Sequence, residues 1–307
     1  MARRRRRALD VATVRLARGA PVAVSSAPGP LLTIGVHDAL LAARRAGRTT
    51  VECSVDLDRS TTVVNVGRRT WVCGGREFPY LDVCRDRTVY HFSGAQFEPV
   101  ARFAGSLIKL VPTEWGPPTF EIDGIKMLPT ARVSPYADAE RKVSLIQPRG
   151  KLILDTCGGL GYFAAWCLRG GARHVQSFEK NPDVIWLRSQ NPWSPDSPWA
   201  GGGEPALTLT EGDVAERIRA LPDASFDAIL HDPPRFGIAG ELYAQRFYDE
   251  LARILRRRCR LFHYTGAPNK LTSGRNVANE VANRLRRAGF ATEISGDGVL
   301  AVNAGRS

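Results

Sequence analysis

The sequence predicts an α/β protein in which a small β-rich α+β region precedes a doubly wound sheet. Apolar strand patterns and amphipathic helix patterns alternate from about residue 134 onward, which is typical of such a sheet. Before that point the strands are short and are separated by Asp, Gly and Pro turns. We therefore expect three segments: a basic, loosely ordered segment 1–30, a small α+β domain 31–133, and a domain 134–307 built on the sheet.

Composition describes an ordinary globular protein. The chain has 307 residues, of which 43% are hydrophobic and 24% are charged, and this length favours about two domains. No apolar run approaches the roughly 20 residues of a membrane helix. The segment after the Arg3–Arg7 run is broken by Arg15, Arg18 and Pro21, which does not fit a signal peptide. We therefore expect a cytoplasmic protein that does not bind membranes.

Net charge and cysteine spacing bear on partners and metals. The formal net charge of +12 suits an acidic partner, with nucleic acid as the obvious candidate. Two arginine clusters weaken this argument, because Arg3–Arg7 fits a terminal tail and 253–260 closes a predicted helix, where cations complement the helix dipole. The six cysteines form no CxxC pair, so we expect reduced thiols and no metal site.

The first half contains one helix and several strands. An amphipathic pattern predicts a helix over 36–47 that ends at Gly47. The strand patterns lie at 49–57, 60–66, 88–92, 97–103, 106–112 and 119–128. No motif assigns a function to this region, and we expect it to help dock a substrate.

The second half contains seven predicted strands. A helix over 134–146 leads into it. Strands are predicted at 151–157, 174–180, 207–213, 226–232, 260–266, 291–295 and 298–303. Helices are predicted at 162–171, 182–190, 214–221, 240–258 and 276–289.

The first of these strands runs into a glycine-rich turn, "LDTCGGLGYF" (154–163). Asp155 ends the strand, and Gly159 and Gly161 permit a tight turn that a ligand can approach closely. The spacing is not G-x-G-x-x-G, and no Lys-Ser/Thr follows, which excludes a P-loop. Taken alone, the turn fits NAD, another nucleotide or no ligand.

The next three strands also end in acidic residues. Glu179 lies 24 residues after Asp155, where a carboxylate can accept both hydroxyls of a ribose. Asp213 follows the third strand and is placed to bind an adenine amino group, and Asp232-Pro233-Pro234 follows the fourth. Each acid alone fits a solvated loop or a helix cap equally well, but four in register favour a ligand site at the carboxyl edge of the sheet.

Together these motifs resemble those of the class I S-adenosylmethionine-dependent methyltransferases. With "NPWS" (191–194) and "LFHYTG" (261–266), they look like a predicted methyltransferase family best known from archaea, over roughly residues 105–303. The resemblance implies a Rossmann-like methyltransferase domain with a seven-stranded sheet. It also implies a site for S-adenosyl-L-methionine formed by Asp155, Cys157, Gly159, Gly161, Glu179 and Asp213, in which Cys157 stands where a glycine is common.

The fourth strand end suggests the chemistry. Two prolines stiffen the backbone, so that a carbonyl and the Asp232 side chain can accept the hydrogens of an amino group and direct its lone pair toward the methyl. In the resembling amino-methyltransferases an aromatic next to the prolines stacks on a flipped base. Here Arg235 intervenes and Phe236 follows, which leaves the stacking role and the target atom open. We assign Asp232, Pro233, Pro234 and Phe236 as catalytic residues that methylate a base nitrogen in RNA, either tRNA or rRNA.

Several alternatives stay open at this point. The same cofactor fold serves methylation of a small molecule or a protein, and aminopropyl transfer of the spermidine-synthase type, suggested by "GGLG" and the β-rich first half. Aminopropyl transfer requires an acidic pair to deprotonate an amine, and "HDPPRF" offers one acid. A C5-pyrimidine reaction would require a cysteine nucleophile near the end of the fourth or fifth strand, where position 235 is arginine and "HYTG" contains no cysteine. A non-catalytic RNA-binding module does not explain the four acids.

Some residues have two readings each. His231 is a general base or a filler of the strand end, and Trp193 stacks on a base or anchors a loop. A few others fit either a ligand contact or a plain structural role: Tyr136, Arg141, Tyr243, Phe247, Tyr248, Lys270 and Arg275. The oligomeric state is not indicated.

Overall fold

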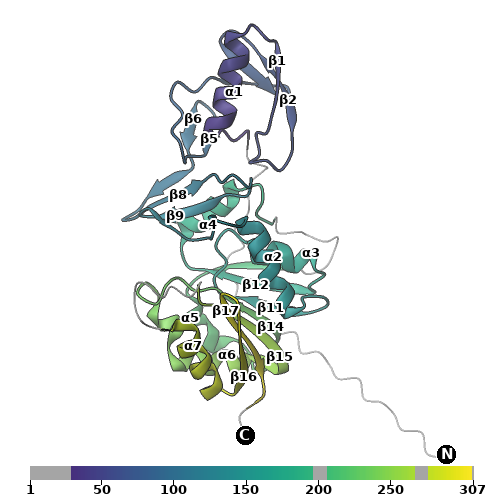
Figure 1. Cartoon of the computed structure of the whole chain (residues 1–307), viewed down its shortest axis with the longest axis vertical. Helices are drawn as coiled ribbons and strands as arrows, with labels where there is room; N and C mark the ends of the chain where they lie inside the picture. The colour runs from purple at the N-terminus through teal and green to yellow at the C-terminus, as the bar shows by residue number, and fades with distance from the viewer. Residues whose placement is uncertain (1–28, 196–205, 267–275, 306–307) are drawn as a thin grey trace, which may run out of the picture.

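The computed structural model describes residues 29–195, 206–266 and 276–305. Figure 1 shows an elongated molecule with the N-terminal elements at one end, the large sheet at the other, and a small antiparallel sheet between them. The Arg3–Arg7 run, Lys270 and Arg275 lie outside the described residues. The segment boundaries at 30 and 133 stay predictions.

The N-terminal elements surround an aromatic core. Helix α1 (Ile34–Arg45) packs on a four-stranded antiparallel sheet of order β1-β2-β3-β4, and β5 pairs with β6. The strands are β1 (Thr50–Cys53), β2 (Thr62–Val66), β3 (Thr70–Cys73), β4 (Arg76–Pro79), β5 (Tyr90–Phe92) and β6 (Phe97–Pro99). Trp71, Phe78 and Phe97 form the buried centre, with ring centroids 5.0 to 6.1 Å apart. Aromatic burial of this size stabilises a region with so few strands.

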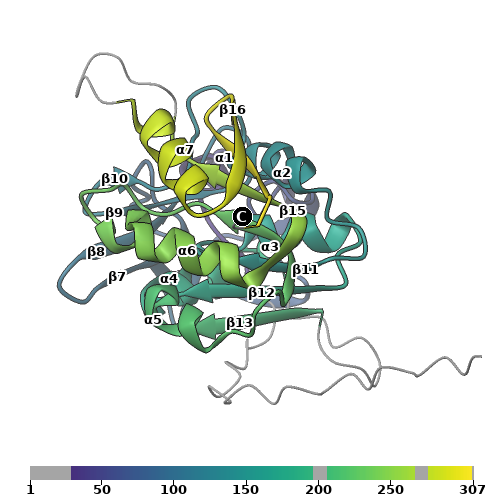
Figure 2. The same cartoon turned by 90° about the horizontal axis from the view of Figure 1, so that it is seen from below.

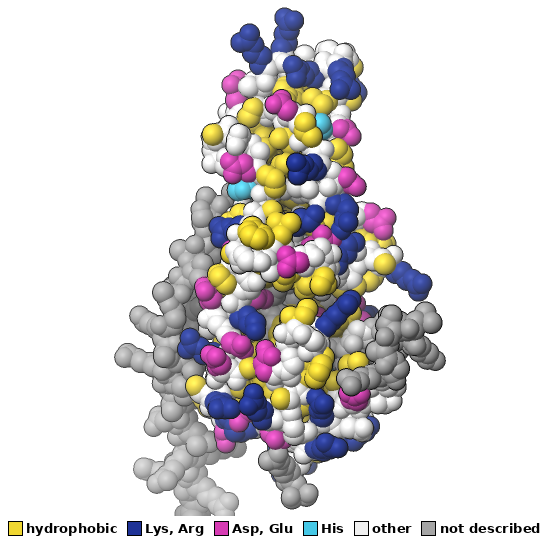
Figure 3. All heavy atoms as spheres, turned by 90° about the vertical axis from the view of Figure 1, so that its left-hand side faces the viewer, with side chains coloured by type: hydrophobic (Ala, Val, Ile, Leu, Met, Phe, Trp, Pro, Cys, Tyr) yellow, Lys and Arg dark blue, Asp and Glu magenta, His cyan; other side chains and the backbone are white. Residues whose placement is uncertain are grey.

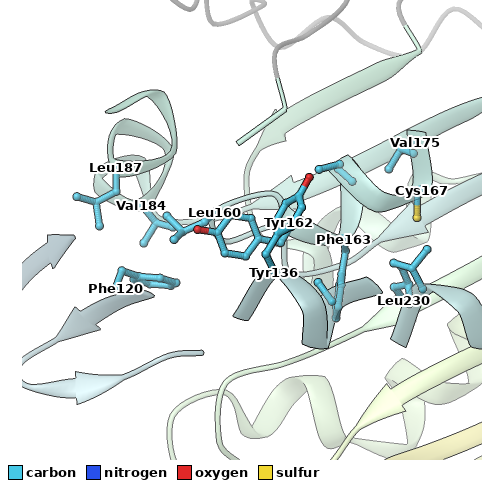
Figure 4. Packing of buried hydrophobic residues seen from close by; sticks show 14 of the residues in the cluster. Phe120, Tyr136, Leu160, Tyr162, Phe163, Cys167, Val175, Val184, Leu187 and Leu230 are labelled. Atoms are coloured by element: carbon cyan, nitrogen blue, oxygen red, sulfur yellow. The ribbon is translucent and has the colours of Figure 1, made fainter. Parts of the chain in front are cut away.

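The middle sheet joins the two ends. It has the order β10-β9-β8-β7 and consists of β7 (Ala101–Phe103), β8 (Leu107–Val111), β9 (Thr119–Ile122) and β10 (Ile125–Lys126). Leu110 and Phe120 belong to the same buried cluster as Leu160 and Val184 of the second half. Figure 4 shows Phe120 beside Val184 and Leu160. This sheet therefore packs directly on the elements that carry the predicted site.

The second half forms one seven-stranded sheet of order β13-β12-β11-β14-β15-β17-β16, in which β17 is antiparallel to both neighbours. Its strands are β11 (Leu152–Asp155), β12 (His174–Glu179), β13 (Leu207–Glu211), β14 (Phe226–His231), β15 (Leu255–Tyr264), β16 (Phe290–Ser295) and β17 (Gly298–Asn303). The doubly wound, seven-stranded sheet predicted from sequence is confirmed.

Alternating residues of these strands face two helical layers. Ile153 packs with α2 (Pro135–Ile146), α3 (Tyr162–Arg169) and α4 (Pro182–Gln190), whereas Leu154 packs with the opposite layer. That layer contains α5 (Val214–Arg217), α6 (Gln245–Ile254) and α7 (Val277–Arg287), with 3₁₀ turns η1 (Ile218–Ala220) and η2 (Gly240–Tyr243). Figure 2 shows α6 and α7 on one side of the sheet and α2 and α3 on the other. Among the described residues, no helix is long and apolar enough to cross a bilayer.

Several predicted elements differ from the structure. The strands expected over 97–103 and 119–128 are each two strands, and β3 and β4 were not predicted. The helix expected over 240–258 ends at Ile254, and Leu255 begins β15. Leu255 is buried and pairs with Phe226, and its carbonyl accepts a hydrogen bond from Asn303 Nδ2 at 2.6 Å. These contacts favour an extended backbone over another helical turn. The arginines that follow therefore lie in a strand and do not complement a helix dipole.

Candidate functional site

The glycine-rich turn joins β11 to α3. Gly159 and Gly161 have positive φ angles of 49° and 80°, a region that residues with a side chain adopt at a cost. The N–H of Gly159 donates to Glu179 Oε2 at 2.9 Å, and the N–H of Gly158 donates to the Phe178 carbonyl at 2.7 Å. The turn is thus fastened to the end of β12.

Two glycines of the turn make room for protein atoms. A Cβ on Gly161 would lie 2.5 Å from Arg188 Cζ, and a Cβ on Gly158 would lie 2.5 Å from Ser177 Oγ. Arg188 comes from α4 and is buried. Sequence reasoning missed this arginine, because a single cation within an otherwise ordinary helix pattern gives no signal of burial.

Asp155 lies behind the turn, where water does not reach it. The residue is fully buried, and its Oδ2 accepts a hydrogen bond of 2.9 Å from Ser177 Oγ. Its Oδ1 has no hydrogen-bond partner among the described residues. Burial raises the pKa of Asp155 to about 6, although the Ser177 hydroxyl and the Arg188 charge act in the opposite direction. Asp155 does not line the cavity described below.

Glu179 ends β12 and reaches that cavity. Its Oε1 accepts from the Asn181 N–H and its Oε2 from the Gly159 N–H, both at 2.9 Å. Burial raises the pKa of Glu179, and these hydrogen bonds and Arg188 oppose the rise. Each carboxylate oxygen keeps further lone-pair capacity, so the side chain can still accept hydroxyl donors from a ligand.

Asp213 acts as a helix cap in this structure. Its Oδ1 accepts from the Ala215 N–H at 2.8 Å, and its Oδ2 lies 3.5 Å from Lys180 Nζ. Asp213 is not among the residues that line the cavity. Its predicted adenine contact therefore stays a prediction.

A cavity of about 110 Å³ lies at the carboxyl edge of the sheet. Six predicted site residues line it: Cys157, Gly159, Glu179, Asp232, Pro233 and Pro234. The other walls come from the middle sheet with the segment after it, from α2, and from the glycine turn with the start of α3: Phe120, Met127, Leu128, Pro129, Pro135, Asp138, Ala139, Lys142, Gly158, Leu160, Tyr162 and Phe163. The glycine turn and the Asp-Pro-Pro turn thus share one cavity.

Helix α2 supplies two charged residues that sequence reasoning did not single out. Ser134 caps this helix and Pro135 occupies its first turn. Asp138 and Lys142 are both buried, with Lys142 Nζ 2.7 Å from Asp138 Oδ2 and 3.7 Å from Asp232 Oδ2. Their i, i+4 spacing on the same face as buried Ala139 and Val143 was the available signal.

The electrostatics of Asp232 reflect this arrangement. Burial raises its pKa, while the Lys142 ammonium lowers it and the charge of Asp138 adds to the rise. Burial lowers the pKa of Lys142, but the two aspartates outweigh burial and leave the pKa of Lys142 raised. The cluster therefore holds a cation between two carboxylates at the cavity wall.

Phe236 lies outside the cavity. Its side chain is exposed, and its ring meets the Tyr243 ring edge-on with centroids 5.6 Å apart. Arg235 is also exposed. The structure brings Asp232, Pro233 and Pro234 together with the glycine turn, but not Phe236.

His231 fills the end of β14. It is fully buried, with Nδ1 2.7 Å from Thr156 Oγ1 and Nε2 3.2 Å from the Leu242 carbonyl. Burial and then the neighbouring His263 lower its pKa well below the usual value. The hydrophobic core on the α6 side of the sheet contains three further candidates, all buried: Tyr243, Phe247 and Tyr248. For all of these residues the structural reading fits the contacts.

The remaining aromatic and basic candidates have structural partners. Trp193 donates to the Leu57 carbonyl at 2.8 Å and packs against Tyr136 with centroids 5.2 Å apart. Arg141 pairs with Asp138 and Asp297 at 2.8 and 2.7 Å. Among the described residues, no group of three or more His, Cys, Asp or Glu side chains is arranged to hold a metal ion.

No protein-family model matches the chain. An uncharacterized protein of Methanocaldococcus jannaschii is 44% identical over 183 residues, which cover 59% of this chain and 61% of that protein. Polyamine aminopropyltransferase 2 of Streptomyces coelicolor is 32% identical over 106 residues, which cover 34% of this chain but 19% of that protein. The chain thus matches less than two thirds of the length of either relative.

A solved structure agrees with the observed topology. A spermidine synthase in complex with the transition-state analogue AdoDATO aligns with a TM-score of 0.52 at 16% identity, over 67% of this chain and 73% of that one. At this identity the likeness concerns the fold alone. The seven-stranded sheet with its antiparallel β17 is the Rossmann-like fold of the class I methyltransferases, which spermidine synthases share.

Proposed function

We propose that this protein is an S-adenosyl-L-methionine-dependent methyltransferase that acts on a nitrogen atom. The observation that carries the proposal is the single cavity lined by Gly159 and Glu179 on one side and by Asp232, Pro233 and Pro234 on the other. Glu179 can accept ribose hydroxyls, and the glycine turn admits close approach of a ligand. These residues therefore fit this cofactor. When bound, it supplies a methyl carbon that its sulfonium makes electrophilic.

Asp232 is suited to the proton-transfer part of such a reaction. If the cofactor binds here, it would supply the methyl group, its sulfur would keep the electron pair of the broken carbon–sulfur bond, and the acceptor nitrogen would give up a proton. The Asp232 carboxylate can take that proton, since its raised pKa makes it a better base than an exposed aspartate. Pro233 and Pro234 fix the backbone beside it.

We propose RNA as the substrate, with a base nitrogen as the target. Five exposed arginines support this choice: Arg44, Arg45 and Arg48 at the end of α1, and Arg68 and Arg69 in the β2–β3 turn. The two groups lie side by side, because Val66 donates a hydrogen bond to the Thr49 carbonyl. Figure 3 shows Lys and Arg side chains gathered at the far N-terminal end of the molecule. Clustered arginines of this kind bind phosphates without reading sequence.

Transfer of labelled methyl tests both parts of this proposal. The protein is incubated with methyl-labelled cofactor and separate RNA, protein and metabolite fractions, and label is expected in RNA. Asp232→Asn should reduce the transfer by at least 100-fold, a loss typical of a missing proton acceptor. Arg68→Glu with Arg69→Glu should raise the KM for RNA without changing kcat. Label found only in small molecules would contradict the proposal that RNA is the substrate.

Aminopropyl transfer is a second candidate, and one observation favours it. That reaction requires an acidic pair, and α2 places Asp138 in the same cavity as Asp232. The sequence match to a polyamine aminopropyltransferase agrees with this candidate. Incubation with decarboxylated S-adenosylmethionine and an aliphatic diamine decides between the two. A new, longer polyamine would support aminopropyl transfer, and no product with this donor would support methyl transfer.

A further inference from the structure

Lys142 is a buried lysine in the wall of the proposed active site. The residue is 1% exposed, whereas lysine side chains are rarely buried unless they are paired. Its ammonium lies 2.7 Å from Asp138 Oδ2, 3.7 Å from Asp232 Oδ2 and 3.5 Å from the centre of the Tyr264 ring. A methionine in its place would have filled the same space without the cost of burying a charge.

The surroundings fix the ammonium in this position. Asp138 lies one helical turn before Lys142 on α2, and its other oxygen accepts from Arg141 at 2.8 Å. Arg141 in turn pairs with Asp297 in the β16–β17 turn. Asp138 is thereby held on two sides, and it holds Lys142 in turn.

Among the residues that the structure describes, Lys142 is the one cation within ion-pair distance of Asp232, and most groups around that carboxyl are acidic. The titratable groups that interact electrostatically with Asp232 come from several neighbouring elements: Asp138 and Lys142 on α2, Asp155 and Cys157 at the glycine turn, Tyr243 in η2, Tyr264 on β15, and Asp297 between β16 and β17. Without Lys142, the Asp232 carboxylate would lie near three other aspartates, Asp138, Asp155 and Asp297, at the cavity wall. Like charges and burial both favour the protonated acid.

We propose that Lys142 is a positioning residue, which keeps Asp232 ionised and oriented so that this carboxylate can take the proton of the acceptor nitrogen. This inference rests on the proposed function, in which Asp232 is the proton acceptor. Lys142 does not touch the reacting atoms and acts through Asp232. Its role holds for methyl and for aminopropyl transfer, because both reactions release a proton from nitrogen.

A purely structural lysine would behave differently. Such a residue would hold α2 against β14 and β15, and its loss would lower stability and activity at every pH alike. A lysine that sets the charge of Asp232 shifts the pH at which that carboxyl titrates. The pH dependence of the Lys142 variants therefore distinguishes the two roles.

The first measurement needs no substrate. The ¹³Cγ resonances of labelled aspartates are titrated by NMR, and that of Asp232 is assigned by its loss in Asp232→Asn. Lys142→Met should raise the Asp232 midpoint by about one pH unit or more, because an opposite charge within about 4–6 Å is lost. Lys142→Arg should restore it. Lys109→Met is the matched control, since Lys109 pairs with the buried carboxylate of Glu121 and does not line the cavity.

A second variant shifts the midpoint the other way. Asp138→Asn removes a negative charge beside Asp232 and leaves Lys142 with that carboxylate as its main partner. The Asp232 midpoint should therefore fall in Asp138→Asn, and this variant remains informative if Lys142→Met does not fold. Midpoints that stay at the wild-type value in Asp138→Asn, or in a folded Lys142→Met, overturn the inference.

Activity then links the titration to catalysis. The acid limb of the kcat profile should move with the Asp232 midpoint in each variant. If the midpoints move and no transfer is detected with any substrate, the charge relation stands and the proposed function fails. If transfer occurs but the acid limb of the kcat profile does not move with the Asp232 midpoint, Lys142 does not act through Asp232. The inference then fails, while the proposed function stands.

Discussion

Gly161 packs directly on the buried guanidinium of Arg188. A Cβ at this glycine would lie 2.5 Å from Arg188 Cζ and 2.7 Å from both Nε and Nη2. Neither residue lines the cavity, whereas Gly159 does. Gly161 therefore makes room for an arginine, whereas Gly159 lines the cavity in which a ligand is expected.

The first prediction follows from that packing. Gly161→Ala should destabilise the protein by about 2–4 kcal/mol, because the φ angle of 80° strains any other residue and the methyl overpacks the arginine. Urea unfolding measures the loss. Gly35→Ala in α1 is the matched control and should be neutral or slightly stabilising, since its Cβ would meet only Thr33 Oγ1 at 4.0 Å. Equal stability of the two variants would contradict the packing argument.

The second prediction concerns pH and Asp155. The folded-state pKa of about 6 lies above the unfolded value of about 3.9, so the folded state binds the proton more tightly. The stability that this gives is fully present below about pH 4 and is lost as pH rises through 6. The loss amounts to about 3 kcal/mol.

Asp155→Asn should abolish this part of the pH dependence. Unfolding free energies of wild type and variant are compared in urea at intervals between pH 4 and pH 7. Wild type should lose stability relative to Asp155→Asn across that range, and Ser177→Asn, which changes the neighbour and keeps the carboxyl, should retain the slope. A constant difference across the range would show that Asp155 does not titrate there.

The fold could be predicted from the sequence because its patterns are local. Apolar runs that end in an acid or a glycine, such as "KLILDTC", mark buried parallel strands, and each was observed as a strand. The end of the predicted helix at 258 was wrong, because the transition at Leu255 depends on contacts with Phe226 and Asn303, which are distant in sequence. Helix patterns cannot report such contacts.

The site could be predicted only in part, for a related physical reason. Acids at strand ends meet at one sheet edge by topology, so Glu179 and Asp232 could be placed together from the chain order. Asp138 and Lys142 lie on a helix before the sheet, and its packing over the carboxyl edge is a tertiary property. Phe236 was expected in the site from its place beside the prolines, but η2 and Tyr243 hold it at the surface.

The third prediction concerns Phe236. Its ring is half exposed and meets the Tyr243 ring edge-on, so Phe236→Ala should change the free energy of unfolding by no more than about 0.5 kcal/mol. A ring at this exposed position contributes to catalysis only by contacting a large substrate. The variant should therefore raise the KM for RNA and leave kcat unchanged, as steady-state kinetics can show. A fall in kcat would show that Phe236 contributes to the chemical step and would contradict this prediction.

The last prediction concerns Trp193, which connects the two ends of the molecule. Its indole donates to the Leu57 carbonyl, packs on Tyr136 of α2, and lies 3.7 Å from the position of a Cβ on Gly116. Trp193→Ala should cost about 2–4 kcal/mol, because a large, partly buried aromatic and a hydrogen bond are lost together. Trp193→Phe should cost about 1 kcal/mol, since it removes mainly the donor.

The control for this prediction is Trp115→Phe. Trp115 also donates a hydrogen bond to a carbonyl, that of Thr130 at 3.1 Å. Its side chain is exposed, however, and this bond joins two residues that are close in sequence. Trp115→Phe should change the unfolding free energy by less than Trp193→Phe, because water replaces a lost bond at an exposed site. Limited proteolysis should also cut Trp193→Ala faster between Leu57 and Gly116, where the chain loses its anchor. Equal cleavage rates in Trp193→Ala and wild type would show that other contacts hold the N-terminal elements in place.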